Sequence, residues 1–205
     1  MFSLTASRYL KTKLINYFCF LFKYIEELSV DDSFKKVIKQ YTWHETESRS
    51  KIRISYEEPQ KPISQPQIIV DATTIKTTSP SIGQSAGENA EQLPVYYYEH
   101  LCDATLRVST YGLIDTEQIA DILNIFIVGI PFVRCFETLS KCRFVINEGV
   151  STSAISKVPI PGATNKLKYE CNVGAMYIIQ TEWSMELGDI GIIEDEFISF
   201  ERTLI

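Results

Sequence analysis

The chain has 205 residues, of which 45% are hydrophobic and 22% are charged, a balance typical of a globular protein with one main core. Its formal net charge is −6 at pH 7, and this acidity argues against a protein that grips nucleic acid through clustered Lys and Arg. Five cysteines without a C-x-x-C pair and only two histidines argue against a zinc site, so we expect free thiols in a reducing compartment.

The first predicted element is a helix over residues 4–28, which contains no Pro or Gly and repeats its apolar residues at steps of three and four. Tyr17 belongs to this apolar stripe, whereas Phe20 and Phe22 lie off its centre. We therefore expect the helix to bury one face on its own domain and another on a neighbouring chain. The apolar run at residues 14–22 is about half as long as a membrane-spanning helix, so no membrane association is expected.

Asp31, Asp32 and Ser33 predict the start of a short second helix that runs through Tyr41. From Lys51 the apolar period changes to two, which predicts a strand at residues 52–56. Three prolines then precede a second strand at residues 68–70. Residues 73–94 are rich in Ser, Thr and Gly, and we expect them to form a long polar loop.

Residues 101–109 alternate apolar and polar side chains and predict a strand. Asp115, followed three residues later by Gln118, predicts an N-cap with its box partner at the start of a helix. That helix should stop before Pro131, or kink there and continue toward Leu139.

Aromatic residues make up 12% of the chain and include three tyrosines in sequence, Tyr96, Tyr97 and Tyr98. Neighbouring side chains of a strand point to opposite faces, so these tyrosines cannot all enter one core. Either the strand is packed on both faces within one domain, or some of the rings are exposed or covered by another chain, as is common for Tyr at interfaces.

The C-terminal third predicts a strand at residues 143–148 and then, at residues 151–165, an extended connection or projecting hairpin that contains Pro159 and Pro161. Residues 167–187 hold one long alternating pattern that includes Trp183. The predicted fold is α+β, a mostly antiparallel sheet with one helix packed across it, plus an N-terminal helical arm. The predicted divisions are the arm at 1–50, the core domain at 51–187 and an acidic tail at 188–205.

No catalytic motif is present: neither histidine, His44 or His100, lies in a nucleophile–base pattern, and there is no G-x-S-x-G, Walker A or G-x-G-x-x-G sequence. We therefore predict no catalytic, metal-binding or cofactor-binding residue, and a function that depends on contacts with other proteins. The candidate interface consists of aromatic residues and prolines, namely Tyr17, Phe20, Phe22, Tyr96, Tyr97, Tyr98, Pro159, Pro161 and Trp183.

The order of these elements resembles that of bacteriophage tail terminator and tail-completion proteins and, more loosely, of other neck connector proteins. The most specific likeness is ATLRVSTYG leading into DTEQIADILNIF, residues 104–126, where such families place an edge-exposed strand and the helix across the sheet. It extends to the strand from Tyr177 to Met185 with its Trp183.

The resemblance implies a virion protein without a cofactor that forms a hexameric ring, caps the tail tube and joins the tail to the head connector. Its partners would be further copies of itself and the neighbouring tail-tube and head-connector proteins, with DNA only as passing cargo. The alternatives are a head-closure or tail-tube structural protein and a monomeric protein-binding module. A small enzyme would require a polar pocket that the sequence does not indicate.

Overall fold

The computed structural model describes residues 6–24, 31–58, 64–78, 95–129, 142–144, 149–160 and 166–184. Its contacts divide the chain into two compact units. The described residues from 6–78 and 99–181 belong to the first unit. Of the second unit, only residues 95–98 and 182–184 are described.

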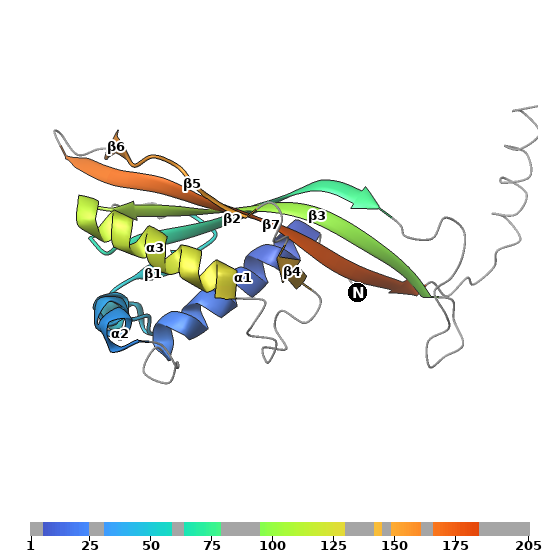
Figure 1. Ribbon diagram of the computed structural model, residues 1–205, viewed down its shortest axis with the longest axis horizontal. Helices are drawn as coiled ribbons and strands as arrows, with labels where there is room; N and C mark the ends of the chain where they lie inside the picture. The colour runs from blue at the N-terminus through green and yellow to red at the C-terminus, as the bar shows by residue number, and fades with distance from the viewer. Residues whose placement is uncertain are drawn as a thin grey trace, which may run out of the picture. The chain divides into compact units, whose positions relative to one another are not determined.

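Helix α1, Ala6–Lys23, buries a wide stripe that includes Leu10, Leu14 and Phe18. It is followed by α2, Asp32–Ile38, and by two single 3₁₀ turns, η2 at Lys39–Tyr41 and η3 at Glu47–Arg49. The Asp31 carboxylate accepts a hydrogen bond from the Ser33 backbone N–H and caps α2 as expected. Helix α3, Leu113–Gly129, completes the helices, and Figure 1 shows all three on one side of the sheet.

The described strands form one sheet in the order β1-β2-β3-β7-β4, with β5 and β6 also paired to β7. Strand β1, Arg53–Ser55, lies parallel to β2, Gln67–Thr78, and β2 lies antiparallel to β3, Val95–Thr110. Arg107 of β3 pairs in register with Ile69 of β2, and the register shifts at a bulge between Thr74 and Lys76. Most pairings are antiparallel, so the predicted α+β fold class is confirmed.

Strand β7, Leu167–Ser184, has 18 residues, and three short strands share the edge that faces away from β3. These are β4, Cys142–Phe144, β5, Val150–Thr152, and β6, Ser156–Pro159, each of them antiparallel to β7. The single long alternation predicted from the sequence is therefore one strand. Its length is explained because its partners divide its edge into consecutive segments.

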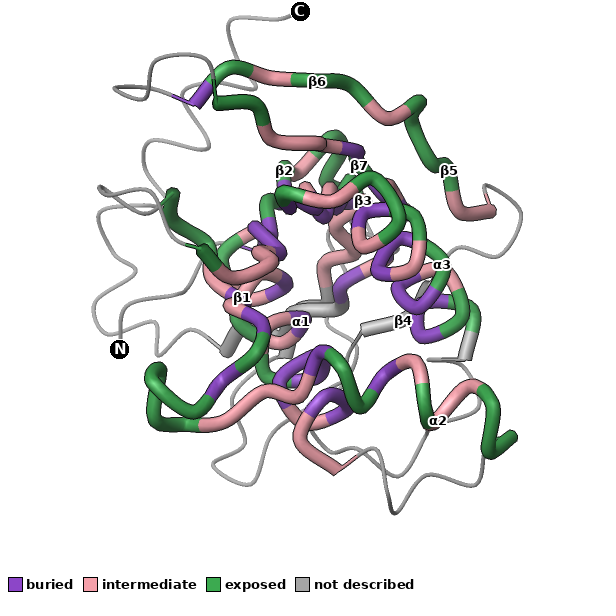
Figure 2. Tube along the Cα trace, turned by 90° about the vertical axis from the view of Figure 1, so that its left-hand side faces the viewer, coloured by how far each residue is buried: buried purple, intermediate pink, exposed green. Residues whose placement is uncertain are grey.

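The core lies between the helices and the sheet, where the buried positions of Figure 2 gather. Strand β3 contributes Cys102, Ala104, Leu106 and Val108, which share one parity and are all buried. Burying a Leu, Ile or Val side chain of this kind contributes about 1.5–3 kcal/mol. The residues of α1 belong to the same cluster as those of the sheet, and the predicted division at residue 50 coincides with no boundary between the two units.

Three sequence-based expectations are corrected. Residues 73–78 continue β2 and are not part of a polar loop, while residues 79–94 lie outside the described part. Helix α3 begins at Leu113, so Asp115 lies in its first turn and is not the N-cap. Strand β3 lies between β2 and β7, so the strand of the segment 104–126 is central and not edge-exposed.

Candidate interaction surface

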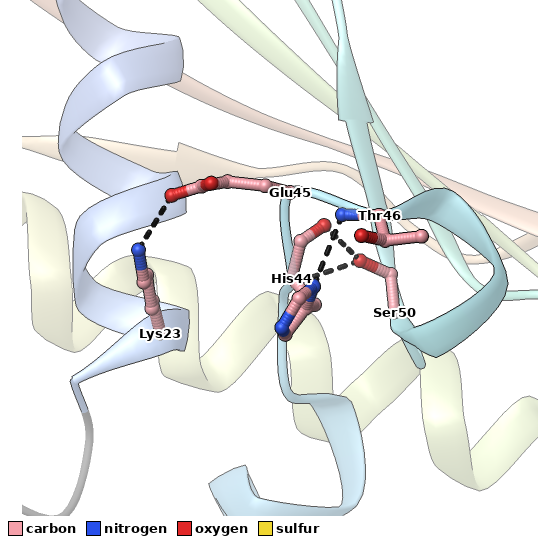
Figure 3. Close-up of polar contacts among 5 residues, drawn as sticks. All are labelled: Lys23, His44, Glu45, Thr46 and Ser50. Atoms are coloured by element: carbon pink, nitrogen blue, oxygen red, sulfur yellow. Dashed lines mark hydrogen bonds and ion pairs between the residues drawn. The ribbon is translucent and has the colours of Figure 1, made fainter.

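The loop around His44 places this histidine close to Ser50, and a serine beside a histidine is the combination that nucleophilic catalysis uses. Here each of the two side chains bonds to backbone groups instead. Figure 3 shows that Ser50 Oγ bonds the backbone of His44, donating to its carbonyl at 2.6 Å and accepting from its N–H at 2.6 Å. The His44 ring accepts a hydrogen bond at Nδ1 from the Thr46 N–H at 3.0 Å. Since the hydroxyl and the ring each bind backbone groups of this loop, their role here is to fix its shape.

Lys23 ties the end of α1 to the same loop, because its Nζ lies 2.7 Å from Glu45 Oε1. The other histidine, His100, lies on β3, where its Nδ1 is 2.9 Å from Thr77 Oγ1 of β2. Burial lowers the pKa of His100 below its usual value. Among the described residues, no three His, Cys, Asp or Glu side chains gather closely enough to hold a metal ion.

A partly buried polar cluster holds the residues after α2 against the start of α3. The Tyr41 hydroxyl, on a side chain that is almost fully buried, lies 2.8 Å from both Asp115 Oδ1 and Gln118 Oε1. The Tyr41 hydroxyl has a single proton, which it donates to the Asp115 carboxylate. The Gln118 amide, turned so that its NH₂ points toward the phenol oxygen, then donates the second hydrogen bond to Tyr41. Burial, and then the Asp115 carboxylate, raise the pKa of Tyr41.

Gly112 makes room for this cluster, because a Cβ at this position would lie 2.4 Å from Asp115 Oδ2. The turn before α3 is closed by Thr110, whose hydroxyl lies 2.7 Å from that of Thr116. The carbonyl of Gly112 accepts hydrogen bonds from both the N–H and the hydroxyl of Thr116. These contacts hold the helix start, and they leave the acidic side chains further along α3 without an assigned role.

The side of α3 that faces away from the core is the most apolar exposed surface of the described chain. Of eight exposed large hydrophobic side chains, five lie between Tyr111 and Val128. At helical steps of three and four they combine with two exposed acids into one stripe, the α3 outer face, which consists of Ile114, Glu117, Asp121, Ile125 and Val128. Monomeric proteins seldom gather exposed apolar residues in this way, so the α3 outer face is the leading candidate interaction surface.

The second candidate is the edge of β2 beyond the segment paired with β1, here called the β2 edge, residues 71–78. Strand β1 pairs with β2 only at residues 67–69, and no other described strand pairs with this side of β2. This edge is protected against pairing with another strand. The Asp71 carboxylate accepts a hydrogen bond from the Ala72 N–H at 2.8 Å and forms an ion pair with Lys11 at 2.5 Å. The bulge and the exposed Lys76 further discourage pairing with another strand.

The candidate interface residues are separated by the structure. Tyr17 and Phe22 are buried in the core of their own chain, and the Tyr17 hydroxyl donates to the Phe126 carbonyl at 3.1 Å, so the prediction that these two residues face a neighbouring chain is wrong. Phe20 and Tyr98 are half-buried, and Pro159 is exposed. The side chains of Tyr96, Tyr97, Pro161 and Trp183 lie outside the described part.

The predicted interface residues did not include Ile114, Ile125 and Val128. A signal was present, because α3 carries isoleucines and a valine on the face opposite its core stripe, where a surface helix normally carries polar residues. No helix in the described ranges is long and apolar enough to span a membrane. The sequence matches no protein-family model and no curated protein sequence.

Proposed function

We propose that this chain is a non-enzymatic structural subunit of the bacteriophage neck or tail, a tail terminator that forms a homo-oligomeric ring, caps the tail tube and joins the tail to the head connector. The observation that carries the proposal is the α3 outer face, an apolar and acidic surface without a partner in the described chain. A surface of this composition is used when another protein covers it.

The succession of a strand and a helix across the sheet at residues 104–126 resembles that of tail terminator and tail-completion proteins, and it supports this choice among the many assemblies that such a surface serves. The likeness is confined to this succession, because β3 is central here whereas such families place an edge-exposed strand. A ring requires heterologous contacts, in which one surface of a subunit meets a different surface of the next. The net charge of −6 suits a protein that surrounds DNA without gripping it, because like charges repel across the channel. The same surfaces would serve a head-closure or tail-tube protein, the nearest alternative roles.

A monomeric protein-binding module is the second candidate, and the β2 edge favours it because an open strand edge accepts an extended peptide. The hydrogen bond between the Ala72 N–H and the Asp71 carboxylate weighs against this candidate. A peptide strand would have to displace the Asp71 carboxylate from the Ala72 N–H and face the bulge between Thr74 and Lys76. For this reason the ring subunit is the better supported function.

The oligomeric state tests the proposal first, by native mass spectrometry of the purified full-length chain over a range of concentrations, alone and with isolated tail tubes that lack their terminal ring. A closed ring, with a hexamer expected, or ring formation on the tube end seen by electron microscopy, supports the proposal. A chain that remains at 23.4 kDa and does not bind tail tubes contradicts it.

A further inference from the structure

The α3 outer face contains charges that the described chain leaves unneutralised. Glu117 and Asp121 are both exposed, lie one helical turn apart and form no ion pair with any described residue. Like charges at this spacing destabilise a helix by about 0.2–0.5 kcal/mol. Helix α3 has three acidic residues and no basic one, so it cannot relieve this repulsion itself. The face therefore fits a partner that offers cations together with apolar surface.

Helix α1 has the opposite character, with four basic residues and no acidic one. Two of the four are occupied, because Lys11 pairs with Asp71 and Lys23 pairs with Glu45. The other two are Arg8, which is exposed, and Lys13, whose Nζ lies 5.2 Å from the centre of the Tyr9 ring. Neither forms an ion pair with a described residue.

The exposed side of α1 presents these two cations beside small polar residues. Arg8, Thr12 and Asn16 are exposed at steps of four, and Lys13 lies next to them; together these residues form the α1 basic face. Arg8 and Lys13 are five residues apart, about 7.5 Å of helical rise and about 140° around the helix, so their side chains flank Thr12 and Asn16 on either side. The two carboxylates of α3 are four residues apart, about 6 Å of rise and about 40° around the helix. The hydrocarbon stems of Arg and Lys can cover the neighbouring isoleucines while their charged ends reach the acids.

The two faces cannot meet within one chain. The opposite side of α1 packs on the core side of α3, where Phe22 and Phe126 rings lie 5.5 Å apart and the Tyr17 hydroxyl bonds the Phe126 carbonyl. With its other side buried there, the α1 basic face points away from the α3 outer face of the same chain. Any contact between them therefore requires two molecules.

We propose that the α3 outer face of one subunit is occupied by the α1 basic face of a second copy of this chain, with Arg8 and Lys13 paired to Glu117 and Asp121. The inference rests on the proposed self-assembly and specifies the contact that performs it. The two faces are different surfaces of one subunit, so each contact leaves one face of each kind free for a further copy, which is the requirement for head-to-tail growth into a ring.

Charge reversal in the full-length chain tests this contact, with assembly followed by native mass spectrometry and the association constant measured by analytical ultracentrifugation. Arg8→Glu with Lys13→Glu, or Glu117→Lys with Asp121→Lys, should each weaken association by about 100-fold or more, because like charges then face each other. Combining all four substitutions should restore most of the affinity. The control matched to the Arg8 and Lys13 variant, Lys35→Glu with Lys36→Glu on α2, changes the net charge by the same amount outside both faces and should leave association unchanged.

The outcomes separate the contact from the function. Rings that form normally in both double variants overturn the contact while the proposed ring function stands. A charge-dependent dimer that never closes into a ring supports the contact and contradicts the ring. A monomeric wild-type chain that stays monomeric on tail tubes overturns both. Circular dichroism of each variant identifies unfolded protein, and the four-substitution variant then decides, since restored assembly requires the pairing of the two faces.

Discussion

The buried hydroxyl of Tyr41 offers the sharpest test of how the region after α2 is held to α3. Its partner Asp115 occupies the space above Gly112, where an added Cβ would approach Asp115 Oδ2 to 2.4 Å. The backbone of Gly112 does not have a positive φ, so alanine can adopt it. Substituting Gly112→Ala should therefore act through the displaced carboxylate and not through backbone strain.

The expected effect follows from two opposing contributions. Moving the carboxylate breaks its hydrogen bond with Tyr41, and hydrogen bonds to charged groups contribute about 1.5–3 kcal/mol. Replacing Gly by Ala at a compatible position stabilises by about 0.4–1 kcal/mol, because the unfolded chain loses freedom. The net result is a loss of about 1–2 kcal/mol in the free energy of unfolding.

Urea denaturation of four proteins measures this loss and its cause: wild type, Gly112→Ala, Tyr41→Phe and the double variant. Phenylalanine at position 41 keeps the buried ring but removes the hydroxyl, so in that background Gly112→Ala should cost little or slightly stabilise. The coupling between the two sites should be about 1 kcal/mol or more, a size common for residues in one hydrogen-bond network. A Gly112→Ala protein as stable as wild type, or one that loses the same free energy with and without the Tyr41 hydroxyl, would show that Asp115 and Tyr41 are not coupled in this way.

Three further predictions follow from single contacts. Lys11 holds the pKa of the Asp71 carboxyl below its ordinary 3.8. Asp71→Asn should therefore lower the free energy of unfolding by less than about 1 kcal/mol at pH 7, as is usual for an exposed pair, and this difference from wild type should disappear as the pH falls below 3.8. A difference that persists at pH 2 would contradict the ion pair. Tyr17→Phe should cost about 1 kcal/mol in urea denaturation, because the Phe126 carbonyl near the end of α3 loses its donor, and an unchanged stability would count against that bond. Burial raises the pKa of Cys19 to about 12, and Cys102 and Cys171 are buried as well, so mass spectrometry after iodoacetamide treatment at pH 8 should find these three thiols unlabelled in the native protein and labelled in urea.

Periodic patterns in the sequence predicted the elements that bury one face. The three- and four-residue steps of α1 and the alternation of β3 and β7 gave the α+β fold class, and the Asp31 cap gave the start of α2. In each case the side chains that must leave water recur at the period of the backbone, so the periodicity is visible in one chain without knowledge of its neighbours.

The failures occur where tertiary contacts override the local pattern. Threonines suggested a loop at residues 73–78, but they are β-branched and continue β2 beside β3, and the bulge between Thr74 and Lys76 breaks the alternation that would have identified the strand. Strands β1 and β2 are parallel, so no hairpin turn joins them, and no local pattern in the sequence predicts their pairing. Phe22 lay off the predicted stripe, yet it is buried because α1 packs against α3 as well as against the sheet.

Helix α3 was predicted from its core stripe, whereas its outer face was not predicted as an interaction surface. Its inner stripe, with Ile119 and Leu123, belongs to the core, and the isoleucines on the opposite side add nothing to that core. Folding alone would tolerate polar residues at Ile114 and Ile125, and a monomer would gain solubility from them. Apolar residues therefore lie on both sides of one helix, and on the outer side they flank two acids that form no ion pair with a described residue. This composition points to a demand beyond folding, which a second copy offering Arg8 and Lys13 would satisfy.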